Sequence, residues 1–208
     1  MTTKRSIFVI PAVFGLTVGA YADTVYVNEG GSIQSAIGAA SSGDVIVVGP
    51  GTYYESVNLQ GRAVTLRSAD GADATIIDAT GLDAPAMLIE NGESNSTVVD
   101  GFTLTGGTGF YIGANTHGGG MFIDFANPIV RNCVFTGNTA AAGGGLAIRT
   151  MTSGLVSNCR FVDNLATAGG NYGGGGVYLQ GGLPRLENCV FEDNMASAAA
   201  KGGGLSIF

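Results

Sequence analysis

The pattern Asn-Cys-x-Phe-x-x-Asn occurs three times in this chain, as NCVFTGN at 132–138, NCRFVDN at 158–164 and NCVFEDN at 188–194. A spacer of small residues and a glycine run follow each copy, and each glycine run opens an apolar-x-apolar step: GGGLAI at 143–148, GGGGVYL at 173–179 and GGGLSI at 202–207. The copies recur at intervals of about 26 to 30 residues. Such a period is typical of stacked repeats that contact only their neighbours, so the sequence predicts a solenoid.

Each copy also predicts a sharp bend in the chain. Large apolar residues stand three positions before each cysteine and again two positions after it: Val130, Val156 and Leu186, then Phe135, Phe161 and Phe191. A flat strand alternates its faces every two residues, so an odd step between two apolar sets requires a corner between them. We place the corner at Asn132, Asn158 and Asn188, because asparagine tolerates the left-handed backbone conformation. We expect these three asparagines to stack as an internal ladder.

Beyond residue 60 the chain consists of short strand and turn patterns, such as AVTLRS at 63–68, ATIIDAT at 74–80 and FTLTG at 102–106. No further helical period of useful length occurs, and the hexapeptide period of left-handed solenoids is absent. The repeat length suits three strands per coil. The fold class is therefore predicted as all-β, a parallel solenoid of about six to seven three-strand coils.

The N-terminus carries the features of an export signal. Lys4 and Arg5 precede an apolar stretch at 7–18, and the small-x-small site Ala20-Tyr21-Ala22 follows it. We predict a signal peptide over residues 1–22 that is cut before Asp23. Because the apolar stretch is shorter than the roughly 20 residues that a spanning helix needs, no membrane span is expected after cleavage. The predicted localisation is secreted, extracellular or cell surface.

Residues 23–60 are expected to form an N-terminal cap and the first coil. Ser32 can cap a short helix in which Ile33, Ala36 and Ile37 share one face. Residues 61–208 are then the remaining coils of the solenoid. The last glycine run ends at Phe208 in mid-coil, which we take as a sign that the coils are truncated at the C-terminal end.

The chain resembles the pectin lyase-like right-handed parallel β-helices, whose coils turn a tight corner at an asparagine. Its segment SIQSAIGAASSGDVIVVGPGTYYESV at 32–57 is similar to the opening of pectinesterases and of secreted polysaccharide lyases. The repeats resemble those of polymorphic outer membrane proteins, with a Gly-Gly-apolar motif at 143–148 and Phe-x-x-Asn at 135–138. The resemblance implies a right-handed β-helix over nearly the whole chain after the signal peptide.

Composition limits the partners. The formal net charge is −7 at pH 7, and after removal of residues 1–22 the only lysine is Lys201. An acidic chain is a poor ligand for polyanions, so we expect no nucleic acid partner. A polysaccharide or a cell-surface protein fits better.

The cysteines and the single histidine are expected to be structural. Cys133, Cys159 and Cys189 share one register and should point inward as a column of small apolar side chains, although neighbouring coils are close enough for a disulfide. A zinc site is excluded because the outer two cysteines lie too far apart, so no metal site is predicted. His117 lacks the partners of a catalytic histidine and is expected in a loop.

The strand after each glycine run offers the candidate site. If Met121 and its equivalents point inward, alternation turns Phe122 and Tyr178 outward. Two residues further, an outward polar column is expected: Gln60, Glu90, Asp124, Arg149 and Gln180. Such a face can bind a sugar chain through Gln60, Phe122, Tyr178 and Gln180, because aromatic rings and hydrogen-bonding groups alternate along it. Alternatively, Asp124 and Arg149 form a surface ion pair.

The same column holds the candidates for catalysis. The resemblance implies a mixture of Asp, Arg and Gln on an exposed face, as in pectinesterases, and a lyase needs a base that is usually Lys or Arg. Arg149 and the pair of carboxylates Asp124 and Glu90 are the candidates here. No cofactor is expected, with Ca²⁺ needed only if the protein is a lyase. The Gln-Asp-Thr-Leu segment of pectinesterases is missing, and IDF at 123–125 is only a weak match to another of their motifs.

We therefore expect a noncatalytic, adhesin-like scaffold or binding surface, with exposed loops at 139–142, 165–172 and 195–201. The alternative is a polysaccharide-active enzyme, of lyase or pectinesterase type, acting on a glycan laid along the outward face. A purely structural coat protein is a third class.

Overall fold

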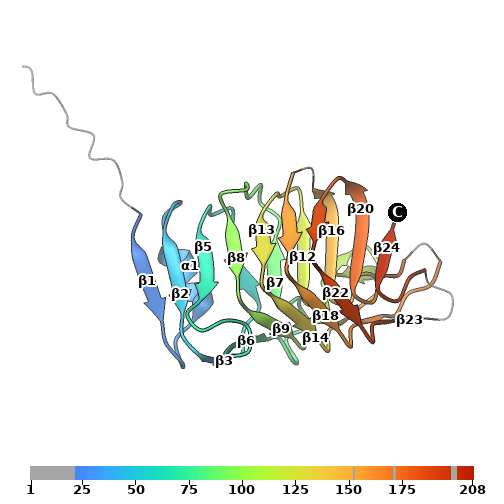
Figure 1. Cartoon of the computed structure of the whole chain (residues 1–208), viewed down its shortest axis with the longest axis horizontal. Helices are drawn as coiled ribbons and strands as arrows, with labels where there is room; N and C mark the ends of the chain where they lie inside the picture. The colour runs from blue at the N-terminus through green and yellow to red at the C-terminus, as the bar shows by residue number, and fades with distance from the viewer. Residues whose placement is uncertain (1–21, 152, 171, 198–200) are drawn as a thin grey trace, which may run out of the picture.

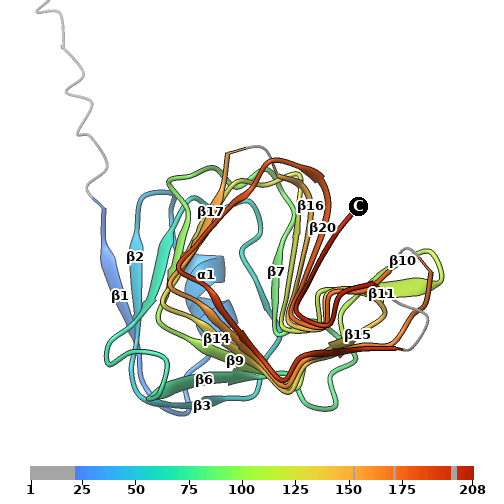
Figure 2. The same ribbon diagram turned by 45° about the vertical axis from the view of Figure 1, so that its right-hand side comes forward.

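The computed structural model describes residues 22–151, 153–170, 172–197 and 201–208. The predicted signal peptide lies outside the described residues, except for Ala22. In the described part, parallel strands follow one another along the long axis of the molecule (Figure 1). Seen from a second direction, successive coils superpose on one outline (Figure 2). The fold is the expected all-β solenoid with one short helix, α1 (Ile33–Ala39).

Three parallel sheets form the walls of the solenoid, as counted over the described residues. The first contains β1 (Thr24–Val27), β2 (Val45–Val48), β5 (Thr65–Ser68), β8 (Val98–Asp100), β13 (Ile129–Arg131), β17 (Leu155–Ser157) and β21 (Arg185–Glu187). The second contains β3 (Gly51–Tyr53), β6 (Thr75–Asp78), β9 (Thr103–Thr105), β14 (Val134–Thr136), β18 (Arg160–Val162) and β22 (Val190–Glu192). The third contains β4 (Val57–Asn58), β7 (Met87–Ile89), β12 (Met121–Asp124), β16 (Leu146–Met151), β20 (Val177–Gly182) and β24 (Leu205–Ile207).

The sheets define six coils in the described chain, from β2, β3 and β4 to β21, β22 and β24. This is the lower end of the predicted six to seven. The later coils contain a short fourth strand that the sequence did not reveal. These strands are β15 (Thr139–Ala140), β19 (Leu165–Ala166) and β23 (Met195–Ala196), and they stack in parallel as a small sheet. The expected exposure of the first spacer is therefore wrong, since Ala140, Ala141 and Ala142 are buried.

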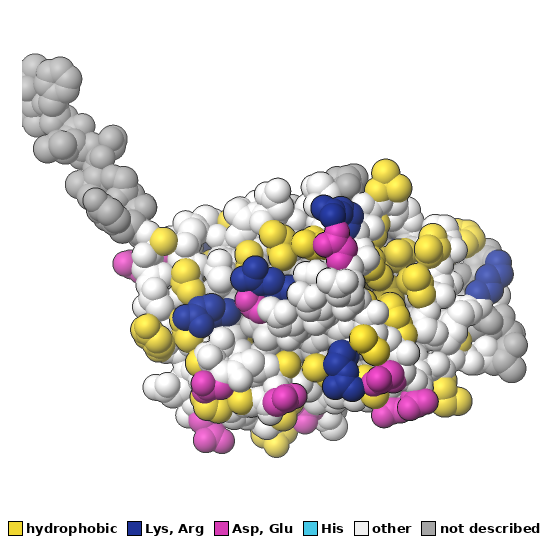
Figure 3. All heavy atoms as spheres, in the orientation of Figure 1, with side chains coloured by type: hydrophobic (Ala, Val, Ile, Leu, Met, Phe, Trp, Pro, Cys, Tyr) yellow, Lys and Arg dark blue, Asp and Glu magenta, His cyan; other side chains and the backbone are white. Residues whose placement is uncertain are grey.

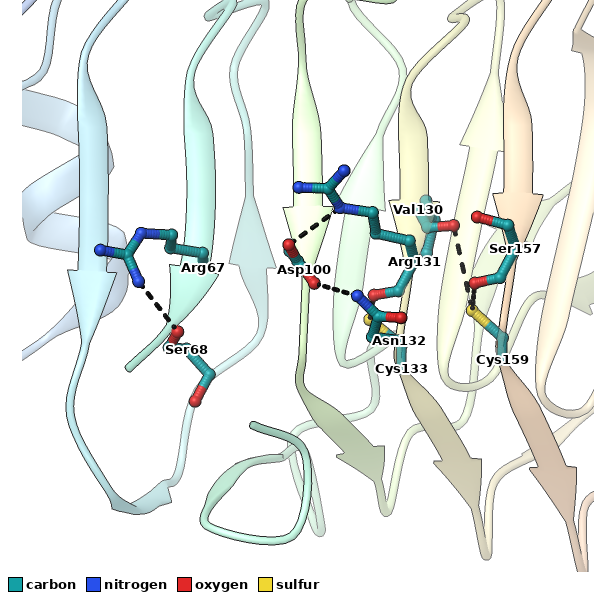
Figure 4. A network of polar contacts seen from close by, with 9 residues as sticks. All are labelled: Arg67, Ser68, Asp100, Val130, Arg131, Asn132, Cys133, Ser157 and Cys159. Carbon is teal, nitrogen blue, oxygen red and sulfur yellow. Dashed lines mark hydrogen bonds and ion pairs between the residues drawn. The ribbon is translucent and has the colours of Figure 1, made fainter. Parts of the chain in front are cut away.

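The corners lie at the three asparagines where the odd spacing of the apolar residues predicted them. Asn132, Asn158 and Asn188 have φ angles of 55°, 52° and 52°, in the left-handed region. The expectation that they form an internal ladder is wrong, because all three are exposed. Their amides bond along the outer surface instead, as where Arg131 and Asn132 both reach the carboxylate of Asp100 (Figure 4).

The internal ladder is made by the second asparagine of each motif. The side chain of Asn138 donates to Asn164 Oδ1 at 3.0 Å, and that of Asn164 donates to Asn194 Oδ1 at 2.9 Å. Each amide also donates to a backbone carbonyl of the preceding coil, as Asn164 does to Phe135 at 2.8 Å. Because Asn138 and Asn164 are almost fully buried, these bonds satisfy groups that would otherwise be costly to bury.

The phenylalanine of each motif fills the core beside this ladder. The Phe135 and Phe161 rings stack with centroids 4.7 Å apart, and Phe161 and Phe191 stack at 5.1 Å. The glycine runs pass close to the same rings. A Cβ on Gly145 would stand 2.6 Å from the carbonyl oxygen of Gly176 and 3.0 Å from Phe161 Cδ1. The glycines are therefore required because backbone from the next coil occupies the space of a side chain.

The cysteines lie in the core as predicted. Cys133 and Cys159 are buried, Cys189 is partly buried, and all three are free thiols. Each thiol donates to the carbonyl two residues earlier, as Cys159 does to Ser157 at 3.2 Å (Figure 4). Hydrogen bonding with the other two thiols and burial raise the pKa of Cys159. Hydrogen bonding with Cys159 lowers the pKa of Cys189 to about 6.

Helix α1 closes the first end of the core, where Ile33, Ala36 and Ile37 are buried as predicted. Ser32 accepts a hydrogen bond from Ser35 N–H at 3.0 Å, the expected cap. The carboxylate of Glu55, which follows β3, accepts from the N–H groups of Ile33 and Gln34 at 2.7 and 3.0 Å. Glu55 thus ties the helix to the first coil and satisfies donors that the helix leaves unpaired.

Candidate functional site

The polar column occupies one register position on the outer face of the third sheet. Asp124 pairs with Arg149, and Arg149 pairs with Gln180, in adjacent strands. The pairing of Ile123 with Ile89 sets Glu90 beside Asp124. The pairing of Asn58 with Leu88 sets Gln60 beside Glu90. The alternation read from the sequence therefore places all five residues in one line, one to a coil.

The middle of the column is an ion pair. Arg149 Nη1 lies 3.3 Å from Asp124 Oδ2, and the side chains are 27% and 11% exposed. Asp124 also accepts the N–H of Phe125 at 3.1 Å. The pair is thus more enclosed than the surface ion pair that the sequence suggested. Next to it, burial and the negative charges of Asp124 and Glu93 raise the pKa of Glu90.

An antiparallel hairpin covers the neighbouring part of this face. Its strands are β10 (Phe110–Ile112) and β11 (Asn115–His117), and it projects beside β15 (Figure 2). Phe122 and Tyr178 point outward from the solenoid core, but both are only 1% exposed. The Phe110 ring stacks on Phe122 at 5.3 Å. The expected open aromatic platform for a sugar is therefore wrong at these two residues.

His117 lies at the centre of this covered region. It ends strand β11 and is 3% exposed, so the expected loop position is wrong. Its ring lies 5.7 Å from Tyr172, 6.0 Å from Tyr178 and 6.3 Å from Phe122. Burial and the nearby Arg149 charge lower the pKa of His117 to about 4. The imidazole is therefore neutral near pH 7 and packs as an aromatic ring.

Arg149 connects the column to the covered aromatic cluster, which we define as Phe110, His117, Phe122, Tyr172 and Tyr178. Burial and Tyr172 raise the pKa of Tyr178, and Arg149 opposes this rise. The Arg149 guanidinium thus pairs with Asp124, and its charge also acts on the pKa values of His117 and Tyr178. Chemically, the exposed remainder of the column offers amide and carboxylate groups, with Glu90 as a carboxyl that holds its proton more readily than usual.

Sequence reasoning missed three parts of this region. Phe125 directly follows Asp124, has a φ of 48° and is 64% exposed, so it is the aromatic side chain that the column presents to solvent. Tyr172 lies in a glycine-rich stretch that shows no periodic pattern of apolar residues. The strands of the hairpin are too short to show such a pattern. The sequence did contain one indication of the hairpin: the consecutive residues Phe110, Tyr111 and Ile112 are of types that favour strands.

Two hollows on the surface lie away from the column. One, of about 420 Å³, is lined by Gly30, Gly31, Ser32, Thr52, Tyr53, Tyr54 and Glu55. The other, of about 360 Å³, is lined by Gly137, Thr139, Asp163, Asn164, Leu165, Asp193 and Met195. Neither contains a column residue.

Several other arginines on the surface are paired with carboxylates. Arg131 pairs with Asp100 and Arg160 with Glu192, each at 2.8 Å. Basic side chains lie next to acidic ones on the face seen in Figure 3 and do not gather into a broad basic patch.

Metal ligands do not cluster in the described chain, where no group of three or more His, Cys, Asp or Glu side chains is placed to hold an ion. The calcium that a lyase would need does not fit the column, because two of its three neighbouring carboxylates are already engaged: Asp124 is bound by Arg149, and Glu93 accepts the N–H groups of Gly61 and Asn91 at 2.8 Å.

The family described as "Right handed beta helix region" matches residues 60–208, and the chain belongs to this family. Its fold is a right-handed parallel β-helix. Among solved structures, the chain is similar to pectin methylesterase from carrot, with 12% identity and a TM-score of 0.45 over 92% of this chain and 78% of that one. A similarity at this level gives no information about catalytic activity. No match is found among curated proteins.

Across the described residues, no helix is both long and apolar enough to cross a membrane.

Proposed function

We propose that this protein is a secreted or cell-surface scaffold of adhesin type, without catalytic activity, that binds a polysaccharide or a cell-surface protein. The observation that carries the proposal is the Asp124–Arg149 ion pair at 3.3 Å, in which the Asp124 side chain is 11% exposed. The two residues best suited to catalysis are therefore engaged with each other.

The binding surface in this proposal is the exposed part of the column, with Gln60, Glu90, Gln180 and Phe125. An extended polymer that crosses the coils meets one polar group at each step of about 4.8 Å. Phe125 offers a ring for stacking against the apolar face of a sugar. Amide groups can both donate to and accept from hydroxyl groups.

Binding of the full chain to a panel of immobilised polysaccharides and to intact cells tests this proposal. Phe125→Ala and Gln180→Ala should each weaken binding by about 1 kcal/mol, or roughly fivefold. Arg67→Gln is the matched control, because Arg67 is exposed on the first sheet. Absence of binding to every surface, or equal loss in the control, contradicts the proposal.

A second candidate, a polysaccharide-active enzyme, is favoured by the raised pKa of Glu90 beside Asp124. A carboxyl that stays protonated can act as a general acid while its neighbour acts as a base. Incubation with pectin, alginate and glycosaminoglycans should then yield unsaturated products, released methanol or new reducing ends. Glu90→Gln and Arg149→Ala should abolish the turnover. Activity that survives both changes excludes this site.

A further inference from the structure

Asp44 is a buried acidic residue that is not part of the polar column. The residue is 7% exposed and directly precedes β2. Its Oδ2 accepts the N–H of Ser41 at 2.7 Å, and its Oδ1 accepts the N–H of Asp23 at 2.9 Å. These two hydrogen bonds lower the pKa of Asp44, and the bond from Ser41 has the larger effect. The carboxylate therefore binds backbone nitrogen from two separate segments.

The Asp23 nitrogen is held in place from its other side as well. The carbonyl of Asp23 accepts the N–H of Val45 at 2.8 Å, and the β1–β2 ladder begins at the next residue, where Thr24 pairs with Val45. Ala22 and Asp23 are both exposed. The peptide bond between them is thus accessible, while the nitrogen on its C-terminal side is fixed against a carboxylate.

This nitrogen is the one that cleavage after Ala20-Tyr21-Ala22 would free. We propose that the Ala22–Asp23 bond is hydrolysed during export and that Asp44 is the binding site for the α-ammonium group created at Asp23. The inference rests on the export that the proposed function includes. Water is the co-reactant, used by a signal peptidase of the export pathway. Its oxygen bonds to the Ala22 carbonyl carbon as the C–N bond breaks, so that this end becomes a carboxylate, and both of its protons go to the Asp23 nitrogen.

Hydrolysis changes the chemistry at Asp44 without moving the nitrogen. A neutral amide N–H becomes an ammonium group, and its hydrogen bond to the carboxylate becomes charge-assisted and stronger. The titratable groups at this point are the carboxyls of Asp44 and of Asp23 itself. Arg62, the cation before β5, is held by the carbonyls of Ala40 and Gly38 at 2.6 and 2.9 Å. The cleaved chain thus starts with an ion pair in place of a peptide bond.

The resulting stability depends on pH in a defined direction. An α-amino group has an ordinary pKa of about 7.7 to 8.0, and the Asp44 carboxylate raises it in the folded chain. The gain is therefore fully present below about pH 7 and disappears as the pH rises through the raised value.

Two measurements test the inference. The full chain is expressed with export, and its N-terminus is read by intact mass, where a start at Asp23 is expected. Melting temperatures of the exported and unexported chains are then compared near about pH 6 and about pH 10. The exported chain should gain several degrees at the lower pH, and the gain should vanish at the higher pH. Asp44→Asn should remove this dependence, because the amide still accepts from Ser41 but carries no charge.

Asp78→Asn is the matched control, since Asp78 bonds only within its own turn, to Thr80 N–H at 2.9 Å. A different N-terminus overturns the cleavage, and a pH-dependent gain that survives Asp44→Asn overturns the binding site. The same comparison on a chain released at Asp23 from a fusion by a site-specific protease tests Asp44 without export. A failure of polysaccharide binding affects neither readout.

Discussion

Two asparagines six positions apart in each motif have different surroundings and should respond differently to mutation. Asn164 is almost fully buried, donates to Phe135 and Asn194, and accepts from Asn138. Asn164→Ala should cost about 2 to 4 kcal/mol of unfolding free energy, because several buried partners are left unsatisfied. Asn158→Gly should cost less than about 1 kcal/mol, since glycine accepts the φ of 52° and the position is exposed. Denaturant unfolding measures both, and equal losses contradict the ladder.

A glycine in the run before the third sheet should be as sensitive as a core side chain. Gly145→Ala should destabilise by about 1 to 3 kcal/mol, because its Cβ would lie 2.6 Å from the backbone oxygen of Gly176. Gly38→Ala is the control, since nothing lies within 4 Å of its Cβ and the residue is in α1. That change should stabilise by up to about 1 kcal/mol. Thermal unfolding of both variants gives the comparison, and a harmless Gly145→Ala would refute the close packing.

The three thiols should react in a defined order. Cys189 is partly buried with a pKa lowered to about 6, whereas burial and hydrogen bonding hold Cys159 protonated. A thiol reagent added to the native chain should therefore label Cys189 first, and Cys133 and Cys159 only on unfolding. Peptide mass mapping over time identifies the order. Early labelling of Cys159 contradicts the packing of the column.

At the scale of elements, the hairpin of β10 and β11 carries a histidine, His117, that should make the stability of the chain fall in acid. The pKa of His117 is lowered in the folded chain to about 4, so the unfolded chain binds a proton first as the pH falls below about 6.5. Stability should therefore drop by about 3 kcal/mol between these values and change no further below them through this residue. His117→Leu should remove that part of the decline. Melting temperatures of the wild-type and His117→Leu chains are measured across this pH range. An equal decline in both chains would contradict the role of His117.

The sheets could be predicted from the sequence because a parallel stack repeats one register. The parity around Cys133 located the corners, and alternation from Met121 located the whole polar column. The hairpin could not be predicted in the same way, since it is inserted once and has no repeat to compare. Its cover over Phe122 and Tyr178 is a tertiary effect that alternation along a strand does not contain. The two asparagines of the motif also look alike in sequence, and only burial separates them.

At the scale of the whole molecule, stability should vary along the axis. Each coil contacts only its neighbours, so a coil with one neighbour is held less firmly than a coil with two. Phe135 and Phe161 are fully buried, while Phe191 is partly buried. In the 208-residue chain, amide hydrogens of β21 and β22 should exchange before those of β13 and β14. Hydrogen exchange with mass spectrometry measures this, and uniform protection would indicate a single cooperative unit.

The segments between each ladder asparagine and the next glycine with a φ near 65° differ in length, at 139–142, 165–173 and 195–201, yet they start and finish at the same two fixed points of the coil. The asparagine ladder anchors one point, and Gly143, Gly174 and Gly202, each at a φ near 65°, anchor the other. Foreign peptides grafted into the two longer segments should leave the register of the sheets intact, whereas the short segment at 139–142 is buried at Ala140, Ala141 and Ala142 and should not accept one. Two successive coils of the solenoid can therefore each display a guest sequence.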